Sequence, residues 1–141
     1  MPAAPSETDE IRHVLEDLTT WAVVGCSADP WRDSHGVAEF LQRRGKRVVP
    51  VNPSVEGEIL GEAVHPDLAS VPAEVGIQVV DVFRRSDQAG THVDEAIAIG
   101  AKAVWLQLGV IDEAAAERAR RAGLIVIMDR CPKIEWPRLG R

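Results

Sequence analysis

Cysteine is scarce in this chain, and the number and spacing of the cysteines argue against a disulfide scaffold and against a metal site. The sequence of 141 residues contains two cysteines, Cys26 and Cys131, which are too few for a disulfide scaffold. The four histidines are scattered, and none lies with a cysteine at metal-ligand spacing, so no metal site is expected. With no signal peptide and no long apolar run, the chain is expected to be cytoplasmic, with reduced thiols and no membrane contact.

Positive charge is also in short supply. The formal net charge is -6, and no basic stripe runs along the sequence, so nucleic acid is not an expected partner. An anionic ligand would need arginine and lysine side chains focused at one place. The length and the ordinary apolar content predict a single domain over residues 1–141.

Five short apolar runs alternate with helical patterns along the chain. The runs, each expected to form a strand, are 21–25, 47–51, 77–83, 103–108 and 124–128. A first helix over 6–18 is predicted by Ser6 as its N-cap and by apolar residues that repeat three and four positions apart. The later helices are expected to begin at Ser34 (or Asp33), Ser86 and Asp112. Residues 129–141 contain two prolines and no helical period, and they predict a surface tail.

This alternation predicts the fold class, an α/β, Rossmann-like three-layer sandwich with a five-stranded parallel sheet. Right-handed crossovers and a nucleotide-type first turn favour the strand order 3-2-1-4-5, counted along the chain. Between the second and third runs we expect only a short extended piece at 58–60 and one helical turn near 66–70. Ligands of such sheets bind at the carboxyl ends of the strands. The segments expected there are 25–34, 52–54, 83–85, 107–109 and 129–133.

The loop after the first strand is the expected binding element. It begins at Gly25 and lacks the second and third glycines of the dinucleotide fingerprint. The second strand ends at Asn52-Pro53 rather than at the acid that would hold an NAD ribose, which argues against a dinucleotide dehydrogenase. A loop of small residues can still hold a phosphate with backbone N–H groups, and Ser27 and Ser34 could add hydroxyl donors.

Several side chains near the strand ends are further candidates. Arg84 and Arg85 follow the third strand, where an arginine can fork onto a phosphate, and we expect at least one of them to face the crevice. Gln107, near the end of the fourth strand, could hydrogen-bond a ligand. Trp31 could stack on an aromatic base or cover an edge of the core, whereas Trp105 is expected in the core.

Candidates for catalysis are few. Cys131 is expected on the ligand side of the sheet near Arg130 and Lys133, whose charges would favour a reactive thiolate. Asp81 and Asp129 could act as acid or base, although aspartates at strand ends more often accept from nearby N–H groups. The sequence contains no evident Ser-His-Asp arrangement or carboxylate pair, so it does not predict a complete catalytic site.

Six short motifs lie in order along the chain. They are Gly25-Cys26-Ser27, Ser34 with Val37, Val51-Asn52-Pro53, Val82-Phe83-Arg84, Trp105-Leu106-Gln107-Leu108-Gly109 and Asp129-Arg130-Cys131-Pro132-Lys133. Together they resemble the motifs of the small bacterial and archaeal CoA-binding domain proteins, which are similar to the N-terminal domain of the succinyl-CoA synthetase alpha subunit. The resemblance extends from the first helix to Lys133 and implies a Rossmann-like fold that binds coenzyme A.

The resemblance also implies roles for individual positions. It places Gly25, Ser27 and Ser34 on phosphate, Asn52 and Pro53 beside the nucleoside, Phe83 and Arg84 on adenine or phosphate, and Gln107 and Gly109 beside the pantetheine. Arg32 and Lys133 are two further candidates for cofactor binding. Cys26 stands where the family would more often have alanine, and it is expected to serve packing.

We therefore expect a protein that binds coenzyme A or an acyl-CoA through its phosphate-binding loop, without a complete catalytic site of its own. The larger ligases carry their phosphorylated histidine on a further domain, for which a chain ending at Arg141 has no place, so a complete ligase reaction is not expected. Two alternatives stay open, an NAD(P)-binding regulatory or redox domain and thiol or acyl exchange at Cys131. A homodimer or a partner protein also stays open.

Overall fold

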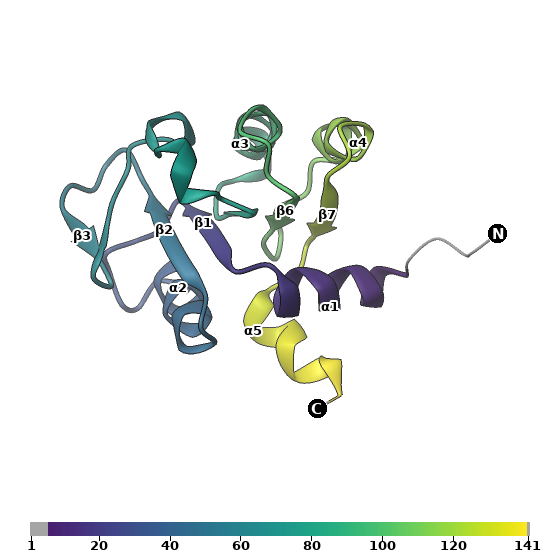
Figure 1. Cartoon of the computed structure of the whole chain (residues 1–141), viewed down its shortest axis with the longest axis horizontal. Coiled ribbons are helices and arrows are strands. Elements are labelled where there is room, and N and C mark those ends of the chain that lie inside the picture. The colour runs from purple at the N-terminus through teal and green to yellow at the C-terminus, as the bar shows by residue number, and fades with distance from the viewer. Residues whose placement is uncertain (1–5, 141) are drawn as a thin grey trace.

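Five parallel strands form the central sheet of the computed structural model, which describes residues 6–140 (Figure 1). The strands are β1 (Thr20–Val24), β2 (Arg47–Val51), β5 (Val79–Val82), β6 (Ala103–Leu106) and β7 (Ile125–Met128). The helices are α1 (Glu7–Asp17), α2 (Asp33–Arg43), α3 (Ser86–Ala98), α4 (Glu113–Arg121) and α5 (Pro132–Glu135). The expected α/β fold class and its five-stranded parallel sheet are confirmed. Across the described residues, no helix combines the length and the apolar character needed to cross a membrane.

One strand takes a different place from the expected one. The order is β2-β1-β5-β6-β7, which counted along the chain is 2-1-3-4-5 and corrects the expected 3-2-1-4-5. The outer edge of β2, where the third strand was expected, is occupied by His65, which forms a parallel bridge with Val51. Because that edge is taken, the chain returns across the sheet, and β5 pairs with β1 instead. The winding of the sheet therefore reverses between β1 and β5, where ligands of such sheets bind.

The connection between β2 and β5 is built from short pieces. A two-stranded hairpin, β3 (Glu58–Ile59) and β4 (Glu62–Ala63), agrees with the expected extended piece. Two 3₁₀ turns follow, η1 (Leu68–Ser70) and η2 (Ala73–Val75), and η1 agrees with the expected helical turn. The connection carries no full crossover helix among the described residues, and the turns lie on the α3 side of the sheet.

Helices α1, α2 and α5 cover one face of the sheet, and α3 and α4 cover the other (Figure 1). Successive side chains of a strand point to opposite faces, so each strand contributes to both cores. The buried core on the α3/α4 face consists of alanine, valine and leucine. The core on the α1/α2/α5 face contains Trp21 and Trp105, whose ring centroids lie 5.8 Å apart. Both tryptophans are fully buried, which confirms the prediction for Trp105.

The helix N-termini follow the sequence signals at α1 and α4. Ser6 and Asp9 form a reciprocal capping box, in which each side chain accepts from the other residue's backbone N–H. At α4 the Asp112 carboxylate accepts from the N–H of Ala115 at 2.9 Å. These caps satisfy N–H groups that lack a partner within the helix, and they confirm both predicted starts.

The serines expected to cap α2 and α3 form hydrogen bonds with neighbouring loops instead. The N-caps of these helices are Arg32 and Arg85, neither of which makes a side-chain capping bond among the described residues. Ser34 and Ser86 lie inside the first turn, so their hydroxyl groups point to facing loops rather than back to their own helix. The Ser86 hydroxyl accepts from the N–H of Ile111 at 2.9 Å, and Ser34 holds the loop after β1.

The chain end corrects the prediction of an irregular tail. After β7 it forms α5 and a 3₁₀ helix, η3 (Trp136–Leu139), which pack against α2 and α1. Pro132 begins α5, a position where the missing N–H of proline costs no helical bond. Arg130 pairs with Glu7 of α1 and with the buried Glu135, which fixes the chain end against the first helix. Two turns are too short to display a helical period, so the sequence pattern did not reveal them.

Candidate ligand-binding site

Two adjoining hollows open at the carboxyl ends of the strands. The larger, which we call the main cleft, has a volume of about 430 Å³ and lies between the loop after β1, α2, the ends of β5 and β6, and α5. The smaller, which we call the loop pocket, has a volume of about 380 Å³ and is bounded by the loop after β1 and the start of α2. Both are lined by Arg32, Asp33 and Phe83, so they form one continuous site.

The structure gathers most of the candidate residues at this site. Those that line one or both hollows are Gly25, Ser27, Arg32, Ser34, Phe83, Gln107 and Lys133. Those that line neither hollow are Asn52, Pro53, Arg84 and Gly109. Within the second group, Asn52 and Gly109 make hydrogen bonds that hold the walls of the site in place.

Gly25 shapes the start of the loop pocket. Its φ is +84°, in the left-handed region, and its N–H donates to the carbonyl of Val51 at 2.8 Å. A Cβ at this position would lie 2.6 Å from the carbonyl oxygen of Phe83, which is closer than a side chain can approach. Both the backbone conformation and the approach of β5 therefore require glycine here.

Hydrogen bonds within the loop fix its path over the pocket. The N–H of Ser27 donates to the buried hydroxyl of Ser34 at 2.9 Å, and the Ser27 hydroxyl accepts from Asp29 N–H at 3.0 Å. From the neighbouring strand end, the side-chain amide of Asn52 donates to the carbonyl of Cys26 at 2.9 Å. Asn52 is therefore a positioning residue, and Ser34 holds the loop where a capping role was expected.

The charges at the site are mixed. Arg32 and Lys133 supply two cations, and Asp33, in the first turn of α2, supplies a carboxylate that lines both hollows. The Lys133 ammonium lies 3.8 Å from where a Cβ on Gly36 would stand, so it reaches across the cleft from α5 to α2. An anionic group entering the site would be attracted by both cations and repelled by the Asp33 carboxylate.

Neither arginine after β5 lines the two hollows that the described residues form. Arg84 donates to the side chain of Gln88 at 2.8 Å, and Arg85 pairs with Asp87. The expectation that one of them would face the crevice is therefore corrected. The reason is local, because α3 begins directly after them and offers both side chains partners within its first turn.

Both backbone polar groups of Gly109 are also hydrogen-bonded within the protein. Its N–H donates to the carboxylate of Asp129 at 2.7 Å, and its carbonyl accepts from Ser86 at 3.2 Å. Asp129 has a φ of 59°, a left-handed conformation that aspartate tolerates better than most residues. Asp129 thus joins the ends of β6 and β7 and is a structural residue.

Sequence reasoning gave no binding role to several residues of the main cleft. Pro30, Asp33 and Leu108 lie within segments that were expected at the strand ends, whereas Gly36, Val37 and Ile134 lie outside them. Gly36 could have been identified from the sequence, since a glycine inside a helix is destabilising and its presence suggests that the space beside it is needed. Ile134 offered no such signal, because its place in the cleft depends on α5. Trp31 and Cys131, which the sequence left with open roles, both line the cleft, and Trp31 is 94% exposed rather than packed on the core.

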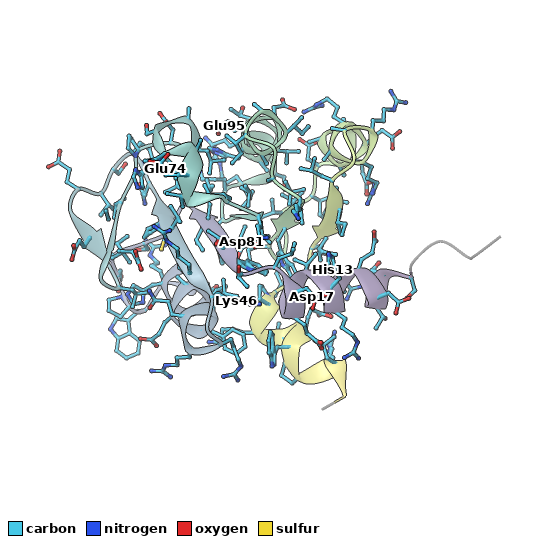
Figure 2. All side chains as sticks on the ribbon, viewed as in Figure 1. His13, Asp17, Lys46, Glu74, Asp81 and Glu95 are labelled. Atoms are coloured by element: carbon cyan, nitrogen blue, oxygen red, sulfur yellow. The ribbon has the colours of Figure 1, made fainter. Side chains whose placement is uncertain are left out.

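A buried carboxyl group lies beneath the floor of the site. Asp81 occupies the middle of β5 and is fully buried, and within residues 6–140 neither of its oxygens has a hydrogen-bond partner. In Figure 2 it lies near the centre of the molecule, whereas Glu74 and Glu95 lie toward the edge. Burial raises the pKa of Asp81 well above its usual range.

The two thiols differ in their surroundings. Burial, together with the nearby Asp81 carboxyl, raises the pKa of the Cys26 thiol to about 11, and Cys26 has no exposed surface. This burial agrees with the expected packing role. Cys131, by contrast, lines the main cleft and is 9% exposed. Gln107 lines the same cleft, and among the described residues its side-chain oxygen has no hydrogen-bond partner. Within residues 6–140, no three histidine, cysteine or acidic side chains lie close enough together to hold a metal ion.

Comparisons with known proteins place the chain in a family. A curated relative, the uncharacterized protein YneT of Bacillus subtilis strain 168, is 36% identical over 125 residues, which cover 89% of this chain and 90% of that protein. The structure of a hypothetical protein from Pyrococcus horikoshii OT3 matches with a TM-score of 0.88 and 35% identity, covering 99% of this chain and 98% of that one.

A larger enzyme shares the fold. The dinucleotide-forming acetyl-coenzyme A synthetase 1 of Ca. Korarchaeum cryptofilum matches with a TM-score of 0.70 and 23% identity, over 84% of this chain and 28% of that one. At that identity the likeness concerns the fold alone. A family model described as a CoA binding domain matches residues 19–137 of the chain. Because that match spans most of the sequence, the chain belongs to the CoA-binding domain family.

Proposed function

We propose that the chain binds coenzyme A or an acyl-CoA across the loop pocket and the main cleft, without a complete catalytic site of its own. The observation that carries the proposal is the continuity of the two hollows through Arg32 and Phe83 in a member of the CoA-binding domain family. An elongated ligand with phosphates near one end fits a site that is mostly polar in the loop pocket and more apolar in the main cleft.

The phosphate groups would enter the loop pocket. Ser27 offers its hydroxyl there, Arg32 offers a guanidinium, and the first turn of α2 offers free N–H groups. Gly25 and Ser34 would keep the loop in the conformation that forms the pocket. The pantetheine arm would then pass Phe83 toward Gln107 and Lys133 in the main cleft.

The other candidate residues would support this arrangement from outside the hollows. Asn52 would hold the loop through the Cys26 carbonyl, with Pro53 ending β2 beside it. Arg84 packs against Gly25, with its Cδ 3.3 Å from where a Cβ would stand, and Gly109 is tied to β7 through Asp129. Substitutions here would therefore weaken binding indirectly, by moving the walls.

Calorimetric titration with coenzyme A, dephospho-CoA and NAD tests the proposal. We expect coenzyme A to bind and the other two to bind more weakly. Lys133→Ala should weaken coenzyme A binding about tenfold, the value of one charge-assisted hydrogen bond. The matched control is Lys102→Ala, an exposed lysine at the opposite, amino end of β6, which should bind as the unaltered protein does.

The outcomes separate the candidate functions. Binding of NAD without binding of coenzyme A would favour an NAD(P)-binding regulatory or redox domain and overturn the proposal. Asp33→Asn adds a sign test, because removing the carboxylate from the first turn of α2 should strengthen coenzyme A binding about two- to fivefold. A weaker affinity in that variant would mean that Asp33 binds the ligand rather than repelling its phosphates.

Thiol exchange at Cys131 is a second candidate, because this thiol lines the main cleft. In the reaction, the Cys131 thiolate attacks the disulfide of oxidised coenzyme A, forms a mixed disulfide and releases one coenzyme A thiolate. Mass spectrometry should locate one coenzyme A on Cys131 after exposure to the disulfide. A Cys131→Ser variant that still acquires coenzyme A, or an unaltered protein that acquires none, would rule the exchange out.

A further inference from the structure

Large apolar side chains are exposed around the main cleft. Among residues 6–140 the exposed large apolar side chains are Trp31, Ile99, Leu108, Ile111 and Ile134. Three of these line this one hollow, with exposed fractions of 94% for Trp31, 56% for Leu108 and 41% for Ile134. Single exposed apolar residues are ordinary, but a group around one cleft is typical of a surface that a ligand covers.

Helix α2 leaves the cleft open at one position. Gly36 lies within the helix, where glycine is less favourable than alanine by about 1 kcal/mol. The nearest described atom to a Cβ there would be the Lys133 ammonium at 3.8 Å, so the backbone conformation and the space would both accept a small side chain. A longer side chain would project into the cleft. Gly36 therefore keeps the space between α2 and α5 clear.

The site changes from polar to apolar along its length. The loop pocket presents Ser27, Ser34 and the Arg32 guanidinium. Beyond the shared Phe83, the main cleft adds Val37, Leu108 and Ile134, with Lys133 beside them. A ligand held by its phosphates in the loop pocket would place its opposite end against this apolar group.

We propose that the apolar end of the main cleft holds the acyl group of an acyl-CoA, so that the protein prefers an apolar acyl chain to free coenzyme A. The inference rests on the proposed function and specifies its ligand class. Continuity with the loop pocket favours this occupant over a second protein chain, since Arg32, which lines both hollows, complements the phosphates of the same ligand. Burial of the Leu108 and Ile134 side chains by the acyl chain supplies the preference.

Titration with coenzyme A, butyryl-CoA, hexanoyl-CoA and succinyl-CoA tests the preference. Affinity should rise from coenzyme A to butyryl-CoA to hexanoyl-CoA, by about two- to fourfold for each added methylene, where the upper value corresponds to complete burial. Succinyl-CoA should gain less than butyryl-CoA, because the cost of desolvating its terminal carboxylate against Leu108 and Ile134 offsets the attraction of the nearby Lys133.

Leu108→Ser tests the place of the chain. It should reduce the gain from butyryl-CoA to hexanoyl-CoA to about twofold or less, since the side chain that covers the added methylenes is shortened. The control is Ile99→Ser, at a residue that is 37% exposed at the end of α3 and lines neither hollow of the site. It should keep the full chain-length dependence.

The possible outcomes distinguish this inference from the function on which it rests. Equal affinity for coenzyme A, butyryl-CoA and hexanoyl-CoA would overturn the acyl-chain proposal and leave coenzyme A binding intact. A preference for succinyl-CoA would overturn it in favour of a carboxylate bound at Lys133. Binding of none of the four would overturn both. A dimer that sedimentation detects and that hexanoyl-CoA does not dissociate would assign the apolar surface to a second copy.

Discussion

The two faces of the sheet are built from different residues. The buried core under α3 and α4 contains alanine, valine and leucine, without an aromatic or sulfur-containing side chain among its described members. The buried core under α1, α2 and α5 contains Trp21, Trp105, both cysteines and the unpartnered Asp81. Neighbouring residues of one strand, such as Val80 and Asp81, therefore lie in very different surroundings.

The unusual residues lie on the face that carries the main cleft. Phe83 and Gln107 continue the same strand faces as Asp81 and Trp105, two residues further on, and reach the cleft floor. The face under α3 and α4 packs the sheet against two helices and the turns η1 and η2, and small and branched residues fill it. The face under α1, α2 and α5 also borders the main cleft, which Phe83 and Gln107 line.

The largest expected effect comes from truncating the large side chain of the cleft face. Trp105→Ala should destabilise the protein by about 3–5 kcal/mol, because it leaves a cavity beside Trp21 and deprives the Arg130 carbonyl of the indole N–H that donates to it. Val104→Ala, the adjacent residue facing α3 and α4, should cost about 2 kcal/mol. Urea unfolding measures both values. Equal costs would mean that the two cores contribute alike.

Sequence reasoning reached the strands because their side chains alternate or run apolar, and it identified Trp105 as core for that reason. It did not reach the strand order. The order depends on where residues 52–78 turn, and the decisive contact, the bridge between His65 and Val51, carries no residue pattern. A pattern within each strand does not specify its neighbour, so a prior for nucleotide-binding folds supplied the order and one strand was misplaced.

The site was predicted in part, and the division follows the range of the interactions. Gly25 and Ser27 lie in a loop whose role follows from the strand before it and the helix after it. The contribution of Ile134 requires α5 to form and to dock on α2, which is a tertiary contact between short elements. Gly36 could have been identified, because a glycine within a predicted helix asks for an explanation.

Thiol reactivity should distinguish the fully buried Cys26 from Cys131, which lines the main cleft. With a pKa of about 11, roughly one Cys26 thiol in a thousand is ionised at pH 8, and Cys26 has no exposed surface. An aromatic disulfide reagent should therefore modify Cys131 at least about 100-fold faster than Cys26, a difference of about 2.7 kcal/mol in activation free energy. The Cys131→Ser variant should lack the fast phase. If that phase persists, Cys26 is accessible and its side of the core is open.

A pH-dependent effect is expected from Asp81. Its pKa is raised in the folded state, so folded protein keeps a proton that the unfolded chain loses near pH 4. Stability from this group is therefore lost as pH rises from about 4 toward the folded pKa. Asp81→Asn should stabilise the protein at pH 8 by about 1 kcal/mol or more, raising Tm by about 2–4 °C, and the gain should shrink toward pH 4.

Thermal unfolding at several pH values measures the Asp81 effect. Asp87→Asn is the control, because this exposed carboxylate on α3 is paired with Arg85 and lies outside both cores. It should produce no gain that grows with pH. A gain for Asp81→Asn that is the same at pH 4 and pH 8 would show that the carboxyl group is not held in its protonated form.

The smallest expected effect concerns two glycines inside helices, one on each face. Gly36→Ala should stabilise the protein by about 0.5–1 kcal/mol, because alanine favours the helix and the new methyl group meets nothing closer than the Lys133 ammonium at 3.8 Å. Gly90→Ala should lose that gain or reverse it, since its Cβ would lie 2.9 Å from the Asp112 carboxylate that caps α4. Urea unfolding of the two variants gives the difference directly. A gain for Gly36→Ala with a loss for Gly90→Ala would mean that Gly90 permits close packing of α3 on α4, whereas Gly36 leaves space beside the main cleft. Equal stabilisation would mean that α3 and α4 can separate at no cost.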